Sequence, residues 1–360
     1  MSLLSQTVAR ASTGVGNRIC ALYAFLIGLN CVAWGLAFWL FSSRPLLLGT
    51  ALLAYTFGLR HAVDADHISA IDNVTRKLMQ DGKRPTGVGF FFSFGHSTVV
   101  LALTAGIAVA AAVVKDHLPV LAQIGQLVGT SVSATFLLLV AAINAFVLLD
   151  IARAFRRARR GESYDCQGVD EMLDQRGLIG RFFRPLLNLA DASWKMYPVG
   201  FLFGLGFDTA TEVGLLGIAA VEAGKGLPVY AILVFPLLFT AGMSLLDTTD
   251  GVLMLGAYGW AFVKPVRKLY YNLVITLVSV LVALIVGGIE AASVIASQLH
   301  LSGGAWDGIR TLSDNFGTLG FIIIGVFLAS WLISTAIYKL RKYDDLDETS
   351  RAAHPTFSSS

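Results

Sequence analysis

Long apolar runs separated by short polar segments dominate the chain. A helix that crosses a bilayer needs about 20 mainly apolar residues, and the sequence contains eight runs of this kind. They cover residues 19–41, 46–66, 88–114, 120–149, 197–221, 229–247, 271–297 and 316–340, and the sixth run leaves room for a kinked extension to residue 262. We therefore expect an all-α polytopic membrane protein with about eight transmembrane helices.

The overall composition supports this prediction. Of the 360 residues, 55% are hydrophobic and only 14% are charged, whereas soluble domains have about 25% charged residues. The three cysteines, Cys20, Cys31 and Cys166, show no paired spacing, so neither a disulfide framework nor a CxxC metal site is expected. The first apolar run is long enough to span a membrane and no A-x-A site follows it, which argues against a cleaved signal peptide.

The positive residues between the runs predict the orientation. With the N-terminus in the cytoplasm, 22 Lys and Arg fall in cytoplasmic segments and 4 in external ones, and Arg60 lies within a run. Cytoplasmic loops are enriched in Lys and Arg, so we expect both termini inside and a location in the cell inner membrane. The expected domains are a cytoplasmic segment 1–18, a transport domain 19–340 with a cytoplasmic loop at 150–196, and a disordered cytoplasmic tail 341–360. The arginines that open the loop predict contact with anionic lipid, and no nucleic-acid partner is expected.

Four chemically active residues lie in the second run, where charged groups are costly and usually functional. They are His61, Asp64, Asp66 and His67. On a continuous helix His61 and Asp64 would be about 60° apart, as would Asp64 and His67, so these three would share one face, while Asp66 would point to an outer shell or another helix. Imidazole and carboxylate at this spacing suit nickel, cobalt or zinc, whereas magnesium and calcium prefer oxygen ligands.

The third run adds His96, directly after Gly95. The glycine allows a neighbouring helix to approach closely, so His96 is expected to face the packed interior. A single histidine in an apolar helix is often a hydrogen-bonded core residue. Beside the second run, we interpret His96 as a further metal ligand.

Acidic residues in the fifth and sixth runs extend the pattern. Asp208 and Glu212 are spaced i, i+4 with Thr211 beside them, and Asp247 and Asp250 are spaced i, i+3. Carboxylates this close repel each other unless a cation, protons or a basic partner lies between them. We interpret these five residues as an ion pathway or gate; helix capping near a loop is the alternative for Asp250.

Other polar residues within the runs allow a broader range of interpretations. Glu290, in the seventh run, is either an ion or proton relay or an interfacial residue. Asn30, in the first run, either shapes the cavity or joins two helices by a hydrogen bond. Val63 lies between the ligand candidates, and with Asn30 it is a candidate for tuning selectivity.

Two short repeats indicate internal symmetry. Gly58-Leu and Gly204-Leu precede the acidic residues of the second and fifth runs, and Gly95-x-Ser and Gly242-x-Ser occur in the third and sixth. Runs three apart cross the membrane in opposite senses, as in inverted-repeat transporters with a site near the midplane.

Together these motifs resemble the nickel/cobalt transporter family of bacterial and fungal permeases. The resemblance rests on Arg60-His-Ala-Val-Asp-Ala-Asp-His-Ile68, Phe94-Gly-His-Ser-Thr-Val-Val100, Leu205-Gly-Phe-Asp-Thr-Ala-Thr-Glu212 and Gly242-Met-Ser-Leu-Leu-Asp-Thr-Thr-Asp250. It implies uptake of Ni²⁺, Co²⁺ or both without an ATPase subunit. It also implies that the two histidines and two aspartates of the second run are essential.

The expected function is therefore secondary uptake of Ni²⁺ or Co²⁺, with the metal ion as the substrate and no separate cofactor. Efflux through the same site is the main alternative, because static residues do not set direction. A membrane metalloenzyme is a weaker alternative, since di-iron membrane enzymes need more histidines than the six in this chain. The sequence leaves the choice between nickel and cobalt open.

Overall fold

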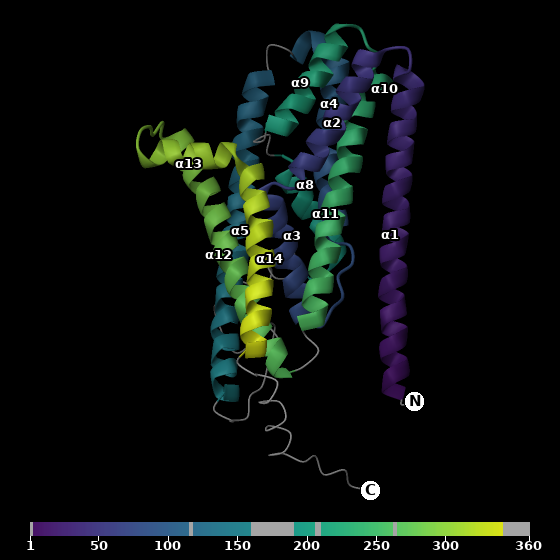
Figure 1. Ribbon diagram of the computed structural model, residues 1–360. Helices are drawn as coiled ribbons and strands as arrows, with labels where there is room; N and C mark the ends of the chain where they lie inside the picture. The colour runs from purple at the N-terminus through teal and green to yellow at the C-terminus, as the bar shows by residue number, and fades with distance from the viewer. Residues whose placement is uncertain (1–2, 115–117, 160–190, 206–209, 262–264, 341–360) are drawn as a thin grey trace.

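The computed structural model describes residues 3–114, 118–159, 191–205, 210–261 and 265–340, and the regular structure within them is helical (Figure 1). Three predicted features lie wholly or largely outside this part of the chain: Asp208, the tail 341–360 and most of the loop 150–196. The longer helices are α1 (Leu3–Phe41), α2 (Pro45–His61), α3 (Ala65–Gln80), α4 (Val88–Val114), α5 (Leu118–Arg159), α9 (Ala210–Gly224), α11 (Val234–Ala261), α12 (Pro265–Gln298) and α14 (Phe316–Leu340). Shorter ones are η2 (Ser193–Lys195), α8 (Met196–Phe203), α10 (Val229–Ile232) and α13 (Ala305–Asp314).

The helices form a multi-pass bundle. Among the described residues, six helical segments are individually long and apolar enough to cross a membrane, and α2 with α3 meets the same test as a pair bent by 50°. Residues 204–209 separate α8 from α9, and four of these six lie outside the described ranges. The beginning of α1 and the end of α14 lie at the same end of the bundle (Figure 1).

Most predicted helix boundaries agree with the structure. The bounds of α4 and α14 match the third and eighth runs, and α11 continues to Ala261, as the kinked extension allowed. The fourth run was predicted to end at residue 149, but α5 continues to Arg159. Arg153 and Arg156 are therefore part of a helix and not of a loop, which the high helix propensity of Ala and Arg in this stretch explains.

The prediction of one continuous helix over residues 46–66 is wrong. The α2 helix ends at His61, and Asp64 has an extended backbone (ψ 146°) from which α3 begins. The carbonyl of Val63, released from helical hydrogen bonding, lies so close to Gly320 of α14 that a Cβ there would collide with it. Because α3 then runs to Gln80, Arg76 is fully buried within a helix and does not lie in a cytoplasmic loop.

Glycines bring α2 and α11 into backbone contact. A Cβ at Gly58 would collide with the carbonyl of Phe239, and a Cβ at Gly242 would come within 2.8 Å of the carbonyl of Tyr55. Gly58 lies three residues after Tyr55, and Gly242 lies three residues after Phe239. Each helix therefore presents a glycine together with the carbonyl three residues before it. Close approach of this kind lets helices gain van der Waals contact in a membrane, where lipid removes the hydrophobic drive for association.

The same arrangement joins α8 and α4. A Cβ at Gly200 would collide with the carbonyl of Phe92, and one at Gly95 would collide with that of Tyr197. Both pairs of helices thus use a Tyr-x-x-Gly segment against a Phe-x-x-Gly segment. By this packing, the counterpart of Gly58 is Gly200. The sequence repeat had instead matched Gly58 with Gly204, four residues further along the chain.

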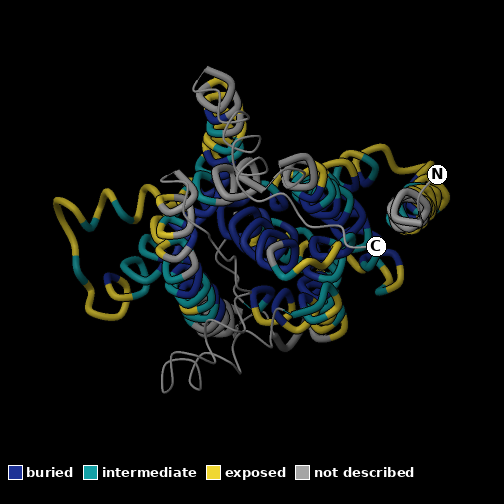
Figure 2. Tube along the Cα trace, turned by 90° about the horizontal axis from the view of Figure 1, so that it is seen from below, coloured by how far each residue is buried: buried dark blue, intermediate teal, exposed yellow. Residues whose placement is uncertain are grey.

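Buried residues gather at the centre of the bundle, and exposed ones lie at its periphery (Figure 2). One apolar cluster joins α3, α4, α8, α12 and α14 around Ile68, Phe92 and Met196, and a second joins α1, α2 and α11 around Ala54 and Phe239. The polar residues of the candidate site lie where these clusters meet.

Candidate metal-ion site

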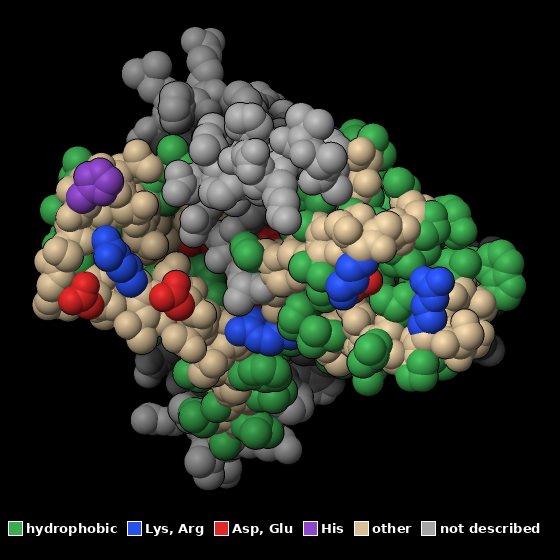
Figure 3. Space-filling view, turned by 90° about the horizontal axis from the view of Figure 1, so that it is seen from above, with side chains coloured by type: hydrophobic (Ala, Val, Ile, Leu, Met, Phe, Trp, Pro, Cys, Tyr) green, Lys and Arg blue, Asp and Glu red, His purple; other side chains and the backbone are tan. Residues whose placement is uncertain are grey.

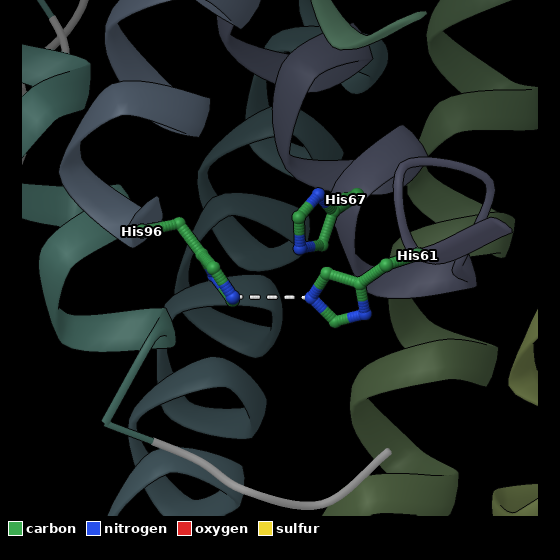
Figure 4. Close-up of side chains that lie close together, drawn as sticks. All are labelled: His61, His67 and His96. Atoms are coloured by element: carbon green, nitrogen blue, oxygen red, sulfur yellow. Dashed lines mark hydrogen bonds between the residues drawn. The ribbon is translucent and has the colours of Figure 1, made fainter. Parts of the chain in front are cut away.

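Three histidines from three helices meet at the centre of the bundle (Figure 4). His61 is the last residue of α2, His67 lies in the first turn of α3 and His96 belongs to α4; each is at most 2% exposed. One ring nitrogen from each belongs to a group of atoms that all lie within 4.8 Å of one another, and the Nε2 atoms of His61 and His96 are 3.1 Å apart. This geometry brings three potential metal ligands to one point.

The helix break is responsible for the meeting of His61 and His67. In a continuous α-helix, residues six apart differ by about 120° in direction and by about 9 Å along the axis. With the break at residues 62–64, the two ring centroids are 4.6 Å apart. The predicted grouping is therefore present, but the regular helical face that was its stated reason is not.

Two carboxylates orient two of the rings from behind. Asp64 Oδ2 lies 2.9 Å from Nδ1 of His61, and Asp247 Oδ2 lies 3.3 Å from Nδ1 of His67. A carboxylate that accepts the Nδ1–H proton leaves Nε2 as the lone-pair nitrogen, which is the usual arrangement of a metal-ligating histidine. Nε2 of His67 is buried and has no hydrogen-bond partner among the described residues.

Glu212 supplies an oxygen at the same point. It lies in the first turn of α9 and is 1% exposed; its Oε1 is 2.8 Å from Nε2 of His96 and 3.8 Å from Nε2 of His61. Next to it, Thr211 Oγ1 lies 3.4 Å from Nδ1 of His61. Both residues had been assigned to a pathway or gate, whereas the structure brings Glu212 into the histidine cluster itself.

Negative charge exceeds positive charge around the three rings. Asp64, Asp66, Glu212 and Asp247 are all buried, and Oδ1 of Asp66 has no hydrogen-bond partner in the described part of the chain. Arg60 bonds to Asp64 at 2.6 Å, but its side chain is 43% exposed at the edge of the cluster. Carboxylates buried close together repel each other unless a cation neutralises them, so the arrangement favours a bound cation.

Asp250 and Glu290 form no hydrogen bond to the three rings among those described. Asp250 belongs to the interior of α11 and not to a loop, and its Oδ2 is buried with no hydrogen-bond partner in the described part of the chain. Glu290 is fully buried between α12 and α5, where the Oγ of Ser133 lies 2.8 Å from one of its oxygens. Glu290 therefore faces the protein interior and not the lipid.

The two selectivity candidates contact different helices. Asn30 donates hydrogen bonds to the carbonyls of Leu26 and, in α11, Ala241, at 2.8 and 3.2 Å. Val63 forms part of the helix break and lies against Gly320 of α14. Asn30 therefore joins α1 to α11, and no contact joins it to Val63 among those described.

A second buried polar network, which was not predicted from the sequence, lies one to three turns further along α3. Ser279 donates to Asp72 at 2.7 Å, and Arg76 donates to Thr276 and Asn73 at 3.1 and 3.2 Å. These residues link α3 to α12. The available signal was the spacing of Asp72 and Arg76, i and i+4 within one helix, but the second run was predicted to end at residue 66 and Arg76 was counted in the cytoplasmic loop after it.

Comparison with known proteins gives the family. The model of the NicO family, described as high-affinity nickel-transport protein, matches residues 47–337. The chain belongs to this family. That membership confirms the resemblance inferred from the four motifs, and with it the function of metal-ion transport.

Curated relatives extend over most of the transporter. A high-affinity nickel transport protein of Cupriavidus necator is 55% identical, covering 91% of this chain and 93% of its own length. The hydrogenase nickel incorporation protein HupN of Bradyrhizobium diazoefficiens is 50% identical over 88% of this chain and 83% of its own. A cobalt transport protein of Rhodococcus rhodochrous, NhlF, is 42% identical over 86% and 85%. No solved structure matches the transporter.

Proposed function

We propose that this transporter takes up Ni²⁺ or Co²⁺ by binding the ion between the Nε2 atoms of His61, His67 and His96 and the carboxylate of Glu212. The supporting observation is the convergence of these four buried groups from four helices. Two ligands at right angles, each about 2.1 Å from a metal ion, are about 3.0 Å apart. The 3.1 Å and 2.8 Å separations at His96 agree with such a pair.

The ligand types favour first-row transition metals. Three imidazoles and one carboxylate suit borderline divalent ions, whereas magnesium and calcium bind through oxygen. The names of the relatives include both nickel and cobalt transport. Val63 beside the ligands and Asn30 on α1 are our candidates for tuning this choice.

The pathway uses the acidic groups on either side of the rings. Asp64 and Asp247 orient His61 and His67, and Asp66 and Asp250 carry the ion onward along α3 and α11. Asp208 and Thr211 belong to the opposite half of the same pathway. Because a divalent ion gains about 4.6 kcal/mol per 100 mV of inside-negative potential, the potential alone is sufficient to drive uptake without an ATPase subunit.

Eight crossings with both termini in the cytoplasm, in the inner membrane, are the topology we propose. Six single spans, the α2–α3 pair and the α8–α9 pair account for eight. The start of α1 and the end of α14 lie at one end, as an even number requires (Figure 1). At the opposite end, described charged side chains are scattered among apolar and other residues (Figure 3), as expected of an external face with few Lys and Arg.

An inverted repeat relates the two halves of this topology. The matching contacts of α2 with α11 and of α8 with α4 support it, since α2 and α8 run in opposite directions and both precede an interruption of the helix. In transporters of this kind one half moves against the other around a fixed site. Such a motion would open the histidine cluster to each side in turn.

Accumulation of radioactive nickel in cells that express the chain tests the proposal. His61→Ala should reduce uptake to the level of cells without the transporter, at normal membrane abundance, because it removes one ligand. His300→Asn is the matched control. His300 is exposed in the turn after α12 and has a positive φ of 52°, which Asn tolerates, so this change removes a histidine without straining the backbone. Full uptake by His61→Ala would contradict the site. Nickel loss from preloaded cells, without uptake, would indicate efflux.

A further inference from the structure

A cavity lies between α1 and the rest of the bundle, and its lining includes none of the residues of the histidine cluster. Its volume is about 500 Å³. Its lining comes from α1, from the segment that connects α3 to α4, from the start of α4 and from η2; it includes Arg18, Phe25, Arg84, Phe90 and Trp194. The site that binds the transported ion uses none of these residues.

Two arginines face this cavity from opposite walls. Arg18 belongs to α1 and Arg84 to the segment before α4, and both are exposed. Neither forms an ion pair among the described residues. The acidic residue next to the lining, Asp191, already pairs with Lys195, whose Nζ is 2.9 Å from Oδ2. The cavity therefore has a positive charge that its surroundings leave uncompensated.

The lining changes from polar to apolar along α1. Thr86 and Ser193 supply hydroxyl groups beside the arginines, whereas Leu22 and Phe25 continue the wall one to two turns further into the bundle. The ring of Phe25 lies 5.7 Å from that of Phe90, so aromatic side chains of α1 and α4 line this part of the cavity together. An occupant must therefore have an anionic, hydrogen-bonding head and an apolar body.

Trp194 marks the depth of this cavity in a membrane. Its side chain is 60% exposed at the same end of the bundle as Arg18 and Arg84. Tryptophan is enriched at membrane–water interfaces, and cytoplasmic Lys and Arg attract anionic lipid headgroups. Under the proposed orientation, this is the cytoplasmic interface.

We propose that this cavity binds an anionic phospholipid of the cytoplasmic leaflet. Its phosphate lies between Arg18 and Arg84, its headgroup hydroxyls meet Thr86 and Ser193, and an acyl chain follows Leu22 and Phe25. The choice of leaflet rests on the proposed topology, but the choice of ligand does not. The apolar wall selects a lipid over a free phosphate ion.

The bound lipid would join α1 to the remaining helices. Beyond Arg18, α1 is attached to α11 through hydrogen bonds of Tyr23 to Thr249 and of Asn30 to Ala241. At Arg18 itself, an anion shared with Arg84 supplies a further link. Phosphatidylglycerol should therefore raise the thermal stability of the purified protein more than phosphatidylcholine does.

Native mass spectrometry of the purified full chain tests the proposal with phosphatidylglycerol and phosphatidylcholine as probes. The double variant Arg18→Gln/Arg84→Gln should retain phosphatidylglycerol about 30-fold less tightly, from about 1 kcal/mol per basic residue. The matched control Arg44→Gln/Arg310→Gln removes two exposed arginines outside the cavity. Thermal melting in each lipid gives a second readout.

Three results would overturn the lipid site: equal phosphatidylglycerol retention by the two double variants, equal retention of both lipids by the unmodified chain, or displacement of phosphatidylglycerol by millimolar inorganic phosphate. The last would indicate a site for free anions. Because these measurements use purified protein without nickel, their failure is distinct from failure of the transport site.

Discussion

Two buried polar regions lie along α3, and they differ in how their charges are compensated. Around His61, His67 and His96, four carboxylates are buried, and Nε2 of His67 and Nδ1 of His96 have no hydrogen-bond partner among the described residues. Around Asp72 and Arg76, one acid and one base are surrounded by neutral hydroxyl and amide groups. A buried polar network whose members satisfy one another stabilises a fold, whereas a cluster that needs an additional cation is suited to binding one.

The two regions are therefore expected to respond differently to mutation. Substitutions in the histidine cluster should change transport with little change in stability. Substitutions in the Asp72–Arg76 network should change stability with little change in the apparent affinity for nickel.

Among substitutions that leave all four proposed ligands in place, Asp247→Asn is expected to have the largest effect on the affinity for nickel. The amide no longer provides the negative charge that holds the Nδ1 proton of His67, and loss of such an orienting group costs about 10–100-fold in metal affinity. The KM for nickel uptake, measured at equal membrane abundance, should rise by that factor. Asp314→Asn, at an exposed aspartate at the end of α13 and outside the proposed pathway, is the matched control. Equal effects of the two changes would mean that Asp247 does not act by orienting His67.

A smaller effect, on stability, is expected from Ser279→Ala. This substitution removes the hydroxyl that donates to the buried carboxylate of Asp72 at 2.7 Å, which costs about 1–3 kcal/mol. The midpoint of thermal unfolding in detergent should fall while the KM for nickel remains within about twofold of that of the unmodified chain. Ser42→Ala, in the exposed turn after α1, controls for loss of a hydroxyl. A raised KM at unchanged stability would place Ser279 in the ion pathway.

The smallest effect is expected from Arg60→Gln. The guanidinium bonds to Asp64 at 2.6 Å, but its side chain is 43% exposed, so solvent weakens the pair to about 0.2–1 kcal/mol. Competition assays with cobalt should detect a change of less than about fivefold in nickel affinity. An effect as large as that of Asp247→Asn would show that Arg60, and not only the aspartate, holds His61 in position.

The sequence predicted the membrane helices and the residue types of the site better than the path of the backbone. Long apolar runs determine where a helix crosses a membrane, so the bounds of α4 and α14 followed directly. The break after His61 did not, because residues 61–65 contain neither Gly nor Pro, and the room for the Val63 carbonyl is provided by a distant residue, Gly320.

Two further differences between the sequence-based predictions and the structure also arise from residues that are distant in sequence. Arg76 was assigned to a cytoplasmic loop because the second run was predicted to end at residue 66, but α3 continues to Gln80 and Arg76 donates to Asn73 on α3 and to Thr276 on α12. Glu212 was assigned to a gate because sequence spacing gives no distance to a histidine 116 positions away. Both depend on contacts between helices, which periodicity within one helix does not contain.

The contact between Gly320 and Val63 gives α14 an uneven tolerance to mutation. Most of this helix faces outward, with Phe321 and Ile322 62% and 56% exposed, so exchange among apolar residues at such positions leaves the fold unchanged. At position 320 even a methyl group would collide with the carbonyl of Val63, in the break between α2 and α3. A residue without any chemistry of its own, on a helix that supplies no proposed ligand, is thus as closely tied to the path of the backbone at the histidine cluster as residues within the break.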